Sequence, residues 1–405
     1  MPSKHILKTI IYLFPLYVIS QSTKKIDGYI FDYQTKTPLE NVDVYFDNNP
    51  LGSVSNFEGY FNIEDERISN NDSIIFSHIG YKEKRYKFSD LIKENTDSFF
   101  LDSETISLDE VVITPITIKG VLDEAINRFD SNHLNSNIVY TGDIIQVNEQ
   151  DTLIKRLLYS DIALKITNHN KVAELFLLKK QFKVQEENTF YKEESMVKIH
   201  QLIDFLNIKE KLFYFADNIT SFDNSLMEKE IYGNKDIYKL TLEKDVAKDK
   251  KSIIIIYLDQ DDYSILSLEL KGDRGNGVDK WHTIKNDKEV KITRRPSYSS
   301  AKISFRPFKD KWVLKEVFVD LDVDYKIKNK KREEHFKNYN YASIRINNFS
   351  INDTLRIINK NSHKVNLKQD VFNQIIDDKR PNTVKYLTNK LSTKELNFVN
   401  KIANE

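Results

Sequence analysis

The sequence predicts a mainly β protein with an N-terminal β-sandwich and a larger α+β domain, in which an antiparallel sheet is accompanied by a few helices. Three observations lead to this fold class. Short alternating strands recur about every ten residues between positions 24 and 114, separated by turn residues, as in sandwiches. Longer strand patterns dominate after Tyr140. Helical periodicity appears before these strands, among them and at the C-terminus.

Hydrophobic residues alternate with polar ones along each short strand, so that one face of the strand can turn toward a core. Pro38, Gly59 and Gly80 mark turns, because proline presets one backbone angle and glycine tolerates angles that other residues avoid. The core or sheet-facing positions that we expect are Ile26, Gly28, Ile30, Val42, Val44, Phe46, Phe61, Ile63, Ile75, Ser77, Val111 and Ile113.

Five segments of this region follow one another in a recognisable order: GYIFD (28–32), TPLENVDV (37–44), GSVSNFEGYF (52–61), SIIFSHIGYK (73–82) and LDEVVI (108–113). Together they resemble a carboxypeptidase regulatory-like domain, in the form common in Bacteroidetes envelope proteins. Ser53 and Ser55 stand where threonine is usual in that family, which leaves the packing unchanged. The resemblance implies a seven-strand Ig-like or transthyretin-like sandwich that stabilises or docks and has no catalytic residues of its own.

The first twenty residues have the pattern of a signal peptide. A basic start precedes an apolar block at 10–19, and Val18 and Ser20 supply the small-residue cleavage pattern before Gln21. This block is too short to span a bilayer, which takes about twenty residues. An uncleaved anchor helix is the alternative. We therefore expect a signal peptide at 1–20, a periplasmic or outer-membrane-associated location and no transmembrane span after cleavage.

Charge balance and the lack of cysteine exclude several classes of function. The 61 basic and 61 acidic residues cancel, so no attraction to nucleic acid or to an anionic membrane is expected. Without cysteine the chain has no disulfide, thiolate metal site, cysteine nucleophile or lipidated N-terminal cysteine. Another envelope protein or an apolar ligand remains as the expected partner.

The pattern changes near Pro115, so we expect the sandwich at 22–114 and a β-rich domain at 116–405. Helical spacing predicts helices at 116–130, 195–207 and 393–402, the last with Ser392 or Thr393 as its cap. The longer strands that we expect are 140–147, 154–166, 172–182, 237–244, 252–258, 263–271, 300–306 and 311–328.

The second domain carries two further resemblances. Segments 252–270 and 309–315 are similar to the C-terminal part of Bacteroidetes exported proteins that bear the same leading sandwich. The rhythm of strands such as 238–242 and 253–259 resembles the half-barrel of lipoprotein-carrier proteins. A half-barrel sheet is therefore the alternative to an ordinary antiparallel one.

Residues 253–258 are apolar at every position, whereas a strand with one solvated face would alternate. One face should pack on the core, and the helices at 116–130 and 195–207 can cover the other. Full closure of these helices on the sheet would give a solid scaffold, which we expect because covered sheets are common. Partial closure would leave a space for an acyl chain or a similar ligand.

The histidines and glycines show no motif with a defined chemistry. The eight histidines lack HxH, HxxxH and HExxH spacings, so local sequence indicates no zinc site. His78 precedes the turn at Gly80 and is expected at the surface or edge of the sandwich. The glycines of 272–277 resemble a phosphate loop without its Lys-Ser/Thr ending, which favours a hairpin loop.

Two acidic clusters have both a chemical and a structural interpretation. The carboxylates of 259–262 could hydrolyse a glycoside, but turns favour Asp, so a polar turn is preferred. Asp320, Asp322 and Asp324 project from one strand face and could hold Ca²⁺. Alternate positions lie about 7 Å apart on a straight strand, which is too far for one ion and favours a solvated face. We therefore expect no catalytic, cofactor-binding or metal-binding residue.

These observations favour a non-enzymatic exported envelope protein. The sandwich is expected to dock or stabilise, and the second domain to bind a partner or an apolar ligand. The alternative is a hydrolase that acts on envelope glycan or peptide.

The mature protein is expected to begin at Gln21, because the apolar block and the small-residue pattern place cleavage after Ser20. Intact-mass measurement on protein recovered from the producing cells checks this. A mass that includes residues 1–20 would contradict the expected cleavage.

Overall fold

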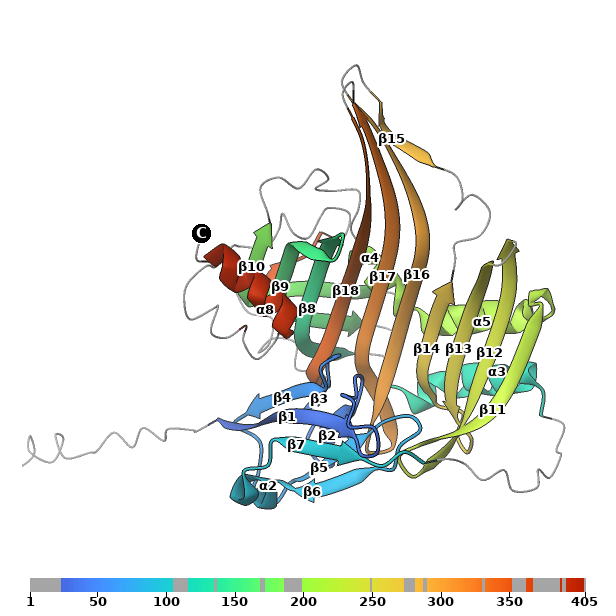
Figure 1. Ribbon diagram of the computed structural model, residues 1–405. Helices are drawn as coiled ribbons and strands as arrows, with labels where there is room; N and C mark the ends of the chain where they lie inside the picture. The colour runs from blue at the N-terminus through green and yellow to red at the C-terminus, as the bar shows by residue number, and fades with distance from the viewer. Residues whose placement is uncertain are drawn as a thin grey trace, which may run out of the picture.

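The computed structural model describes residues 23–104, 116–134, 137–167, 172–185, 199–247, 250–272, 281–286, 290–329, 332–351, 362–366, 387 and 391–403. Among these residues the strands form three sheets, two in an N-terminal sandwich and one large sheet in the rest of the chain (Figure 1). The predicted fold class is confirmed, because the protein is mainly β, with a leading sandwich and a larger sheet accompanied by helices.

The sandwich consists of seven strands in two sheets, as the resemblance implied. One sheet has the order β4-β1-β7 and the other β3-β2-β5-β6. All neighbours are antiparallel except β1 and β7. The strands are β1 (Lys24–Asp32), β2 (Asp43–Phe46), β3 (Gly52–Val54), β4 (Tyr60–Asp65), β5 (Ser73–Ser77), β6 (Lys84–Lys87) and β7 (Ser98–Leu101).

The core of the sandwich forms from the inward side chains of both sheets. Gly59 has a φ of +77° and lies against the Ile30 carbonyl, so a side chain at this position would clash. A helix that the sequence did not predict, α2 (Phe88–Glu94), adds Phe88 and Leu91 to the core. Val111 and Ile113 lie outside the described residues, and all other expected positions are buried: Ile26, Gly28, Ile30, Val42, Val44, Phe46, Phe61, Ile63, Ile75 and Ser77.

One antiparallel sheet organises the rest of the chain. Its order is β11-β12-β13-β14-β16-β17-β18-β8-β9-β10-β19, and β15 pairs with β16 beside this path. The strands are β8 (Ile138–Gln150), β9 (Leu153–Thr167), β10 (Val172–Gln185), β11 (Asn224–Tyr232), β12 (Lys235–Ala247), β13 (Lys250–Asp259), β14 (Ile265–Gly272), β15 (His282–Asn286), β16 (Val290–Phe308), β17 (Lys311–Asn329), β18 (Glu333–Ile351) and β19 (His363–Lys364).

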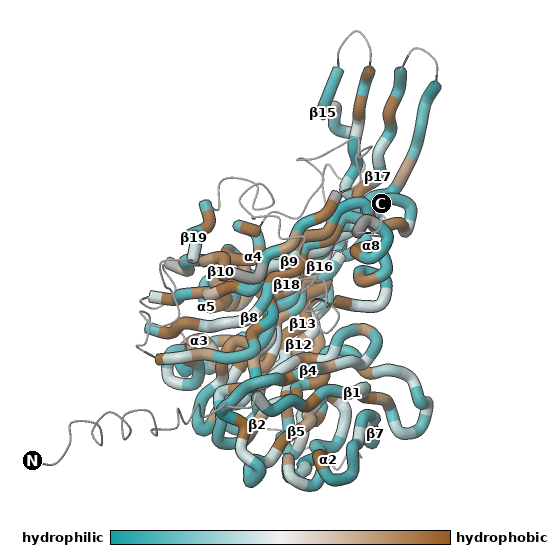
Figure 2. The backbone as a smooth tube through the Cα atoms, turned by 90° about the vertical axis from the view of Figure 1, so that its left-hand side faces the viewer, coloured by the Kyte–Doolittle hydropathy of each residue, from teal (hydrophilic) through white to brown (hydrophobic). Residues whose placement is uncertain are grey.

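Strands β16, β17 and β18 have 19 residues each, which corresponds to a length of about 65 Å. Their ends project beyond the neighbouring strands as an arm (Figures 1 and 2). A small core formed by Ile292, Val323, Tyr325, Ile327 and Phe336 lies within the arm. The arm is therefore packed, although it stands away from the main body.

Helices cover both faces of the large sheet (Figure 1). On the inner face lie α3 (Ile118–Asn132), α4 (Ile199–Phe205) and α5 (Ile208–Asp217), with the short 3₁₀ turn η1 (Ile219–Ser221) after α5; α8 (Thr393–Ala403) lies on the outer face. Neighbouring residues show the division, because Ile144 belongs to the core under α3–α5 and Ile145 to the core under α8. None of the helices that the structure describes has the length and hydropathy needed to cross a membrane.

Helix α8 begins with a capping box, which identifies Ser392 as the cap. The Glu395 N–H donates to Ser392 Oγ at 3.3 Å, and the Ser392 N–H donates to Glu395 Oε2 at 2.7 Å. The expected helices at 116–130 and 393–402 are confirmed with small changes at their ends. The helix expected at 195–207 is α4, whose described part begins at Ile199.

The predicted longer strands are all confirmed, although most extend further than expected. The sequence did not predict β11, β15, β18, β19, the first half of β16 or α5. In β18 the inward positions include Asn338 and Asn340, which weakens the alternation of apolar and polar residues. The predicted junction of the two domains, near 114–117, lies largely outside the described residues.

A buried ion pair fixes the sandwich on the outer face of the sheet. Lys315 Nζ of β17 lies 3.0 Å from Asp43 Oδ1 of β2 and donates to the Asn41 carbonyl at 2.9 Å. The Tyr232 hydroxyl of β11 donates to Asp43 Oδ2 at 2.6 Å. Asp43 and Lys315 are 2% and 5% exposed. Burial lowers the pKa of Lys315, and Asp43 opposes this shift. Each charge therefore needs the other in this dry seam.

Arg306 of β16 adds a second buried contact between the two parts of the chain. Its Nη1 donates to the Ile346 carbonyl and its Nη2 to the Pro50 carbonyl of the sandwich, both at 3.3 Å. Gly52 lies against the guanidinium, where any Cβ would overlap with it. At another point of the seam the Gly80 N–H donates to the Ile231 carbonyl at 2.8 Å. Polar contacts thus join the sandwich to β11, β16 and β17.

A fragment of residues 22–114 is expected to unfold cooperatively on its own. Its core is separate from the cores of the large sheet, so the hydrophobic contacts that hold it together remain in the fragment. Thermal unfolding followed by circular dichroism checks this. A fragment that stays disordered while the full chain folds would show that the sandwich depends on the sheet.

Replacement Asp43→Ala is expected to destabilise the full chain by about 3–5 kcal/mol, because it leaves the Lys315 charge buried and unpaired. Urea unfolding measures the change. The control is Asp123→Ala, which removes a solvent-exposed i,i+4 pair with Lys119 and should cost less than about 1 kcal/mol. Equal effects of the two variants would refute the importance of the seam pair.

Candidate functional site

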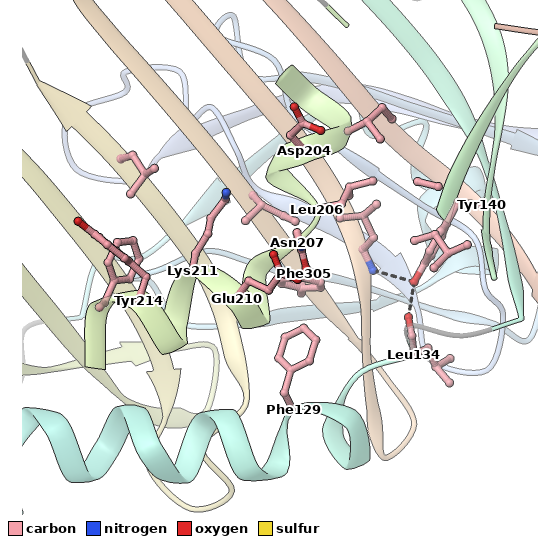
Figure 3. A pocket seen from close by; sticks show the side chains of 17 residues that line it. Phe129, Leu134, Tyr140, Asp204, Leu206, Asn207, Glu210, Lys211, Tyr214 and Phe305 are labelled. Atoms are coloured by element: carbon pink, nitrogen blue, oxygen red, sulfur yellow. Dashed lines mark hydrogen bonds between the residues drawn. The ribbon is translucent and has the colours of Figure 1, made fainter. Parts of the chain in front are cut away.

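A cavity of about 680 Å³ lies between the inner-face helices and the large sheet (Figure 3). Its walls are mainly apolar, and its charged and amide lining residues come from α4, α5 and the turn between them. The helices contribute Phe129, Ile203 and Phe215 to the apolar wall, and the strands contribute Leu270, Ile303 and Leu314, among others. The cavity is therefore apolar inside and polar along one side.

The sheet curves around this cavity. Ala173 of β10 and Leu270 of β14 both line it, although β16, β17, β18, β8 and β9 lie between these two strands. In a flat sheet β10 and β14 would be about 29 Å apart. One cavity can touch both strands only because the sheet bends around the helices, as in a half-barrel.

The described parts of the helices do not close fully on the sheet, in contrast to the full closure that was expected. The described part of α4 has 7 residues and α5 has 10, which corresponds to lengths of about 10 and 15 Å. In the described part of the chain, these two short helices, separated by Leu206 and Asn207, do not fill a concave sheet of this width. Part of the apolar surface of the sheet is covered, as at Ile254, Ile256 and Leu258, and another part lines the cavity.

Two aromatic side chains of the wall are held by a buried histidine. His133, at the end of α3, stacks on Phe129 with ring centroids 4.4 Å apart and meets Phe305 edge-on at 4.8 Å. Its Nδ1 lies 3.2 Å from the Phe129 carbonyl and its Nε2 lies 3.0 Å from the Ile265 carbonyl. Burial lowers the pKa of His133 to about 4. This neutral imidazole positions the wall of the cavity.

Tyr140 of β8 carries the one polar group on the strand side that Figure 3 shows with dashed hydrogen bonds. Its hydroxyl donates to the Leu134 carbonyl at 2.7 Å and accepts from the Leu314 N–H at 3.3 Å. Burial raises the pKa of this hydroxyl above its usual value. The group is therefore neutral and engaged with the backbone, and it leaves the deep part of the cavity apolar.

The mouth of the cavity carries charged and amide side chains. Asp204 and Glu210 are exposed, and Lys211 is half-buried with Nζ over the Phe205 ring at 5.2 Å. Burial lowers the pKa of Lys211, while Asp204 and Glu210 oppose this shift. The Asn207 Oδ1 is buried and accepts no hydrogen bond from the described residues. Charge and hydrogen-bonding capacity are thus concentrated at the opening.

This arrangement suits binding of an amphipathic molecule. An apolar chain gains free energy by entering the cavity, while its polar end stays at the charged mouth. Among the residues that the structure describes, no group of three or more His, Asp or Glu side chains is placed to hold a metal ion.

A polar groove of about 420 Å³ lies on the outer face between the sandwich and α8. Several of its charges are engaged with one another or with neighbouring elements. Glu316 accepts from Ser343 Oγ at 2.8 Å, and Glu269 lies 3.1 Å from Lys302 Nζ. The Tyr341 hydroxyl bonds to Glu395 of α8. The groove therefore holds the sheet and its covering elements together.

The acidic cluster at 259–262 forms a turn between β13 and β14, as preferred from the sequence. Asp259 Oδ1 accepts the N–H groups of Asp261 at 2.9 Å and Asp262 at 3.3 Å. Asp262 Oδ1 in turn accepts the Ser264 N–H at 2.8 Å. These carboxylates are engaged in the backbone of the turn, which is the structural interpretation.

The second acidic cluster, the row of three aspartates at 320, 322 and 324 on β17, also interacts with the neighbouring strand. Asp320 accepts the Ser300 N–H at 2.7 Å, and Asp324 pairs with Arg295 at 2.6 Å. Burial raises the pKa of Asp322, and Asp320 adds to this shift. The partners of the row thus include an arginine and a backbone amide of β16.

His78 lies in the seam between the sandwich and the sheet, which refines its expected place at the surface or edge of the sandwich. Its Nδ1 lies 2.7 Å from the Ile79 carbonyl. Burial and the nearby Lys315 charge lower its pKa to about 4. Of the glycine-rich segment 272–277, only Gly272 is described, at the end of β14.

Sequence reasoning missed the residues at the mouth of the cavity. Asn207, Glu210 and Lys211 fall where the predicted helix ended and α5 was not expected. A signal was present, because Ile208, Leu212, Phe215 and Ala216 recur at helical spacing and are buried. This spacing was not recognised as a second helix, because the chain bends between two short helices.

Comparison with protein-family models bears on the sandwich. Residues 26–113 match the CarboxypepD_reg-like domain. The sandwich is a module of that family. The match supports the resemblance seen in the sequence. A comparison with curated proteins gave no match for the chain.

Proposed function

We propose that the large domain binds a single-chain amphiphile, with its acyl chain in the cavity and its polar end at the mouth. The observation that carries this proposal is the combination of an apolar interior with charged side chains confined to the opening. The curved sheet with helices in its concave side adds support, through its likeness to the half-barrel of lipoprotein carriers. Binding of this kind requires no catalytic group.

The size of the cavity suits one acyl chain. About 680 Å³ falls within the roughly 300–1,000 Å³ of small-molecule sites. Burying ten methylene groups contributes about 8 kcal/mol, and this corresponds to a dissociation constant of about 1 μM before the entropy of association is subtracted. Contacts of the polar end at the mouth must therefore offset this entropy if the dissociation constant is to stay in the micromolar range.

In this proposal the CarboxypepD_reg-like sandwich stabilises the curved sheet from its outer face and offers a docking surface to an envelope partner. Its seam contacts reach β11, β16 and β17, and Ile303 and Leu314 of the last two strands line the cavity. The signal-peptide pattern at 1–20 supports a location in the periplasm or at the outer membrane. At that location the protein would have access to amphiphiles.

Native mass spectrometry of protein purified from the producing cells tests this function. The parent chain is expected to carry one lipid per molecule. Ala173→Trp is expected to lose most of it, because the indole fills the space between β10 and the helices. The control is Leu226→Trp on β11, where the side chain is exposed and outside the cavity.

Both variants are first checked for an unchanged melting profile. A parent chain that neither carries a lipid nor takes up an added monoacyl lipid would refute the proposal. Lipid retained by folded Ala173→Trp at the parent's stoichiometry would place the ligand elsewhere.

A further inference from the structure

The charges at the mouth of the cavity are not neutralised by one another. Asp204 is an exposed residue near the end of α4, and Glu210 and Lys211 lie near the start of α5. Both carboxylates act on the Lys211 ammonium electrostatically. Within the described chain, however, none of the three forms an ion pair, which would require 4 Å or less. Two negative charges and one positive charge thus face a ligand that enters here.

Of these three charged groups, the Lys211 ammonium would be stabilised most by a ligand. Its ammonium is half-buried above the Phe205 ring, and burial lowers its pKa although two carboxylates are near. An ammonium that has lost part of its water is stabilised by an anion that reaches it without a large desolvation cost. An anionic group at the polar end of the amphiphile would supply this partner.

Asn207 adds a second requirement, for a hydrogen-bond donor. It occupies the N-cap position of α5, yet its side chain makes no capping bond. The Oδ1 atom is buried and has no donor among the described residues. A buried acceptor without a partner is costly, so a ligand that donates to it is favoured. Asp204 and Glu210 also line the mouth and favour a donor that carries a positive charge.

We propose that the polar end of the bound amphiphile is zwitterionic, with an anion beside Lys211 and a primary ammonium that donates to Asn207 Oδ1 near Asp204 and Glu210. This inference rests on the proposed function. A purely anionic head would meet two unbalanced carboxylates. A neutral head would leave Lys211 without a partner. A quaternary ammonium would carry the charge but could not donate a hydrogen bond.

Three monoacyl lipids with the same chain separate these cases: a lysophosphatidylethanolamine, a lysophosphatidic acid and a lysophosphatidylcholine. Their affinities for the delipidated, full-length mature protein are measured by titration calorimetry below micelle-forming concentrations. We expect the ethanolamine lipid to bind at least about fivefold more tightly than either of the others.

Variants test the assigned residues. Asn207→Leu should remove the preference for the ethanolamine lipid over the choline lipid. Lys211→Met should weaken binding of all three phosphate-bearing lipids, and Lys211→Arg should restore it. The matched control is Lys209→Met, which removes a neighbouring lysine that pairs with Asp130 at 2.6 Å and does not line the cavity. Unchanged melting temperatures show that each variant is folded.

The outcomes separate the two proposals. Equal binding of the three lipids, or tightest binding of the acid or the choline lipid, overturns the zwitterionic head while the acyl-chain function stands. Preference for the ethanolamine lipid that survives in Asn207→Leu and Lys211→Met also overturns it. If none of the three lipids binds, the acyl-chain function itself fails.

Discussion

The Asp43–Lys315 ion pair determines how the two parts of the chain meet. Neither charge has access to water, so each depends on the other and on the hydroxyl and carbonyl groups around them for compensation. This compensation requires β2 of the sandwich, β11 and β17 to keep one relative position. The pair therefore sets the orientation of the sandwich more than it adds stability, because burying two charges costs much of what their attraction returns.

The same region of the sheet connects the seam to the cavity. At the β-bulge between Ser304 and Phe305 the register of β16 against β17 shifts. Phe305 then lines both the cavity and the space under the sandwich. Bulges bend and twist a strand locally, and a bend here helps the sheet curve around α3–α5. The position of the sandwich and the shape of the cavity are thus linked through one strand.

Local patterns in the sequence were sufficient for the sandwich and for most long strands. There the alternation of side chains is regular, and glycines such as Gly59 stand where only glycine fits. This alternation did not predict the structure where tertiary contacts determine which residues are buried. Asn340 occupies an inward position of β18, where Asn148 of β8 bonds to it across the strands. Helix α5 follows α4 after only two residues, Leu206 and Asn207. The cavity could not be predicted, because it arises from the curvature of strands that are distant in sequence and from helices too short to fill the space.

Strand β11 ends the large sheet on one side among the described residues, which leaves one edge of its backbone without a neighbouring strand. Such an edge invites a second chain to add a strand and start aggregation. In this protein the Gly80 N–H of the sandwich donates a hydrogen bond to the Ile231 carbonyl, so this carbonyl already has a partner. The preceding residues Glu228, Lys229 and Glu230 would bring charge into any new strand pair. Charged side chains on an edge strand oppose such pairing, so this edge disfavours the addition of a second copy of the chain.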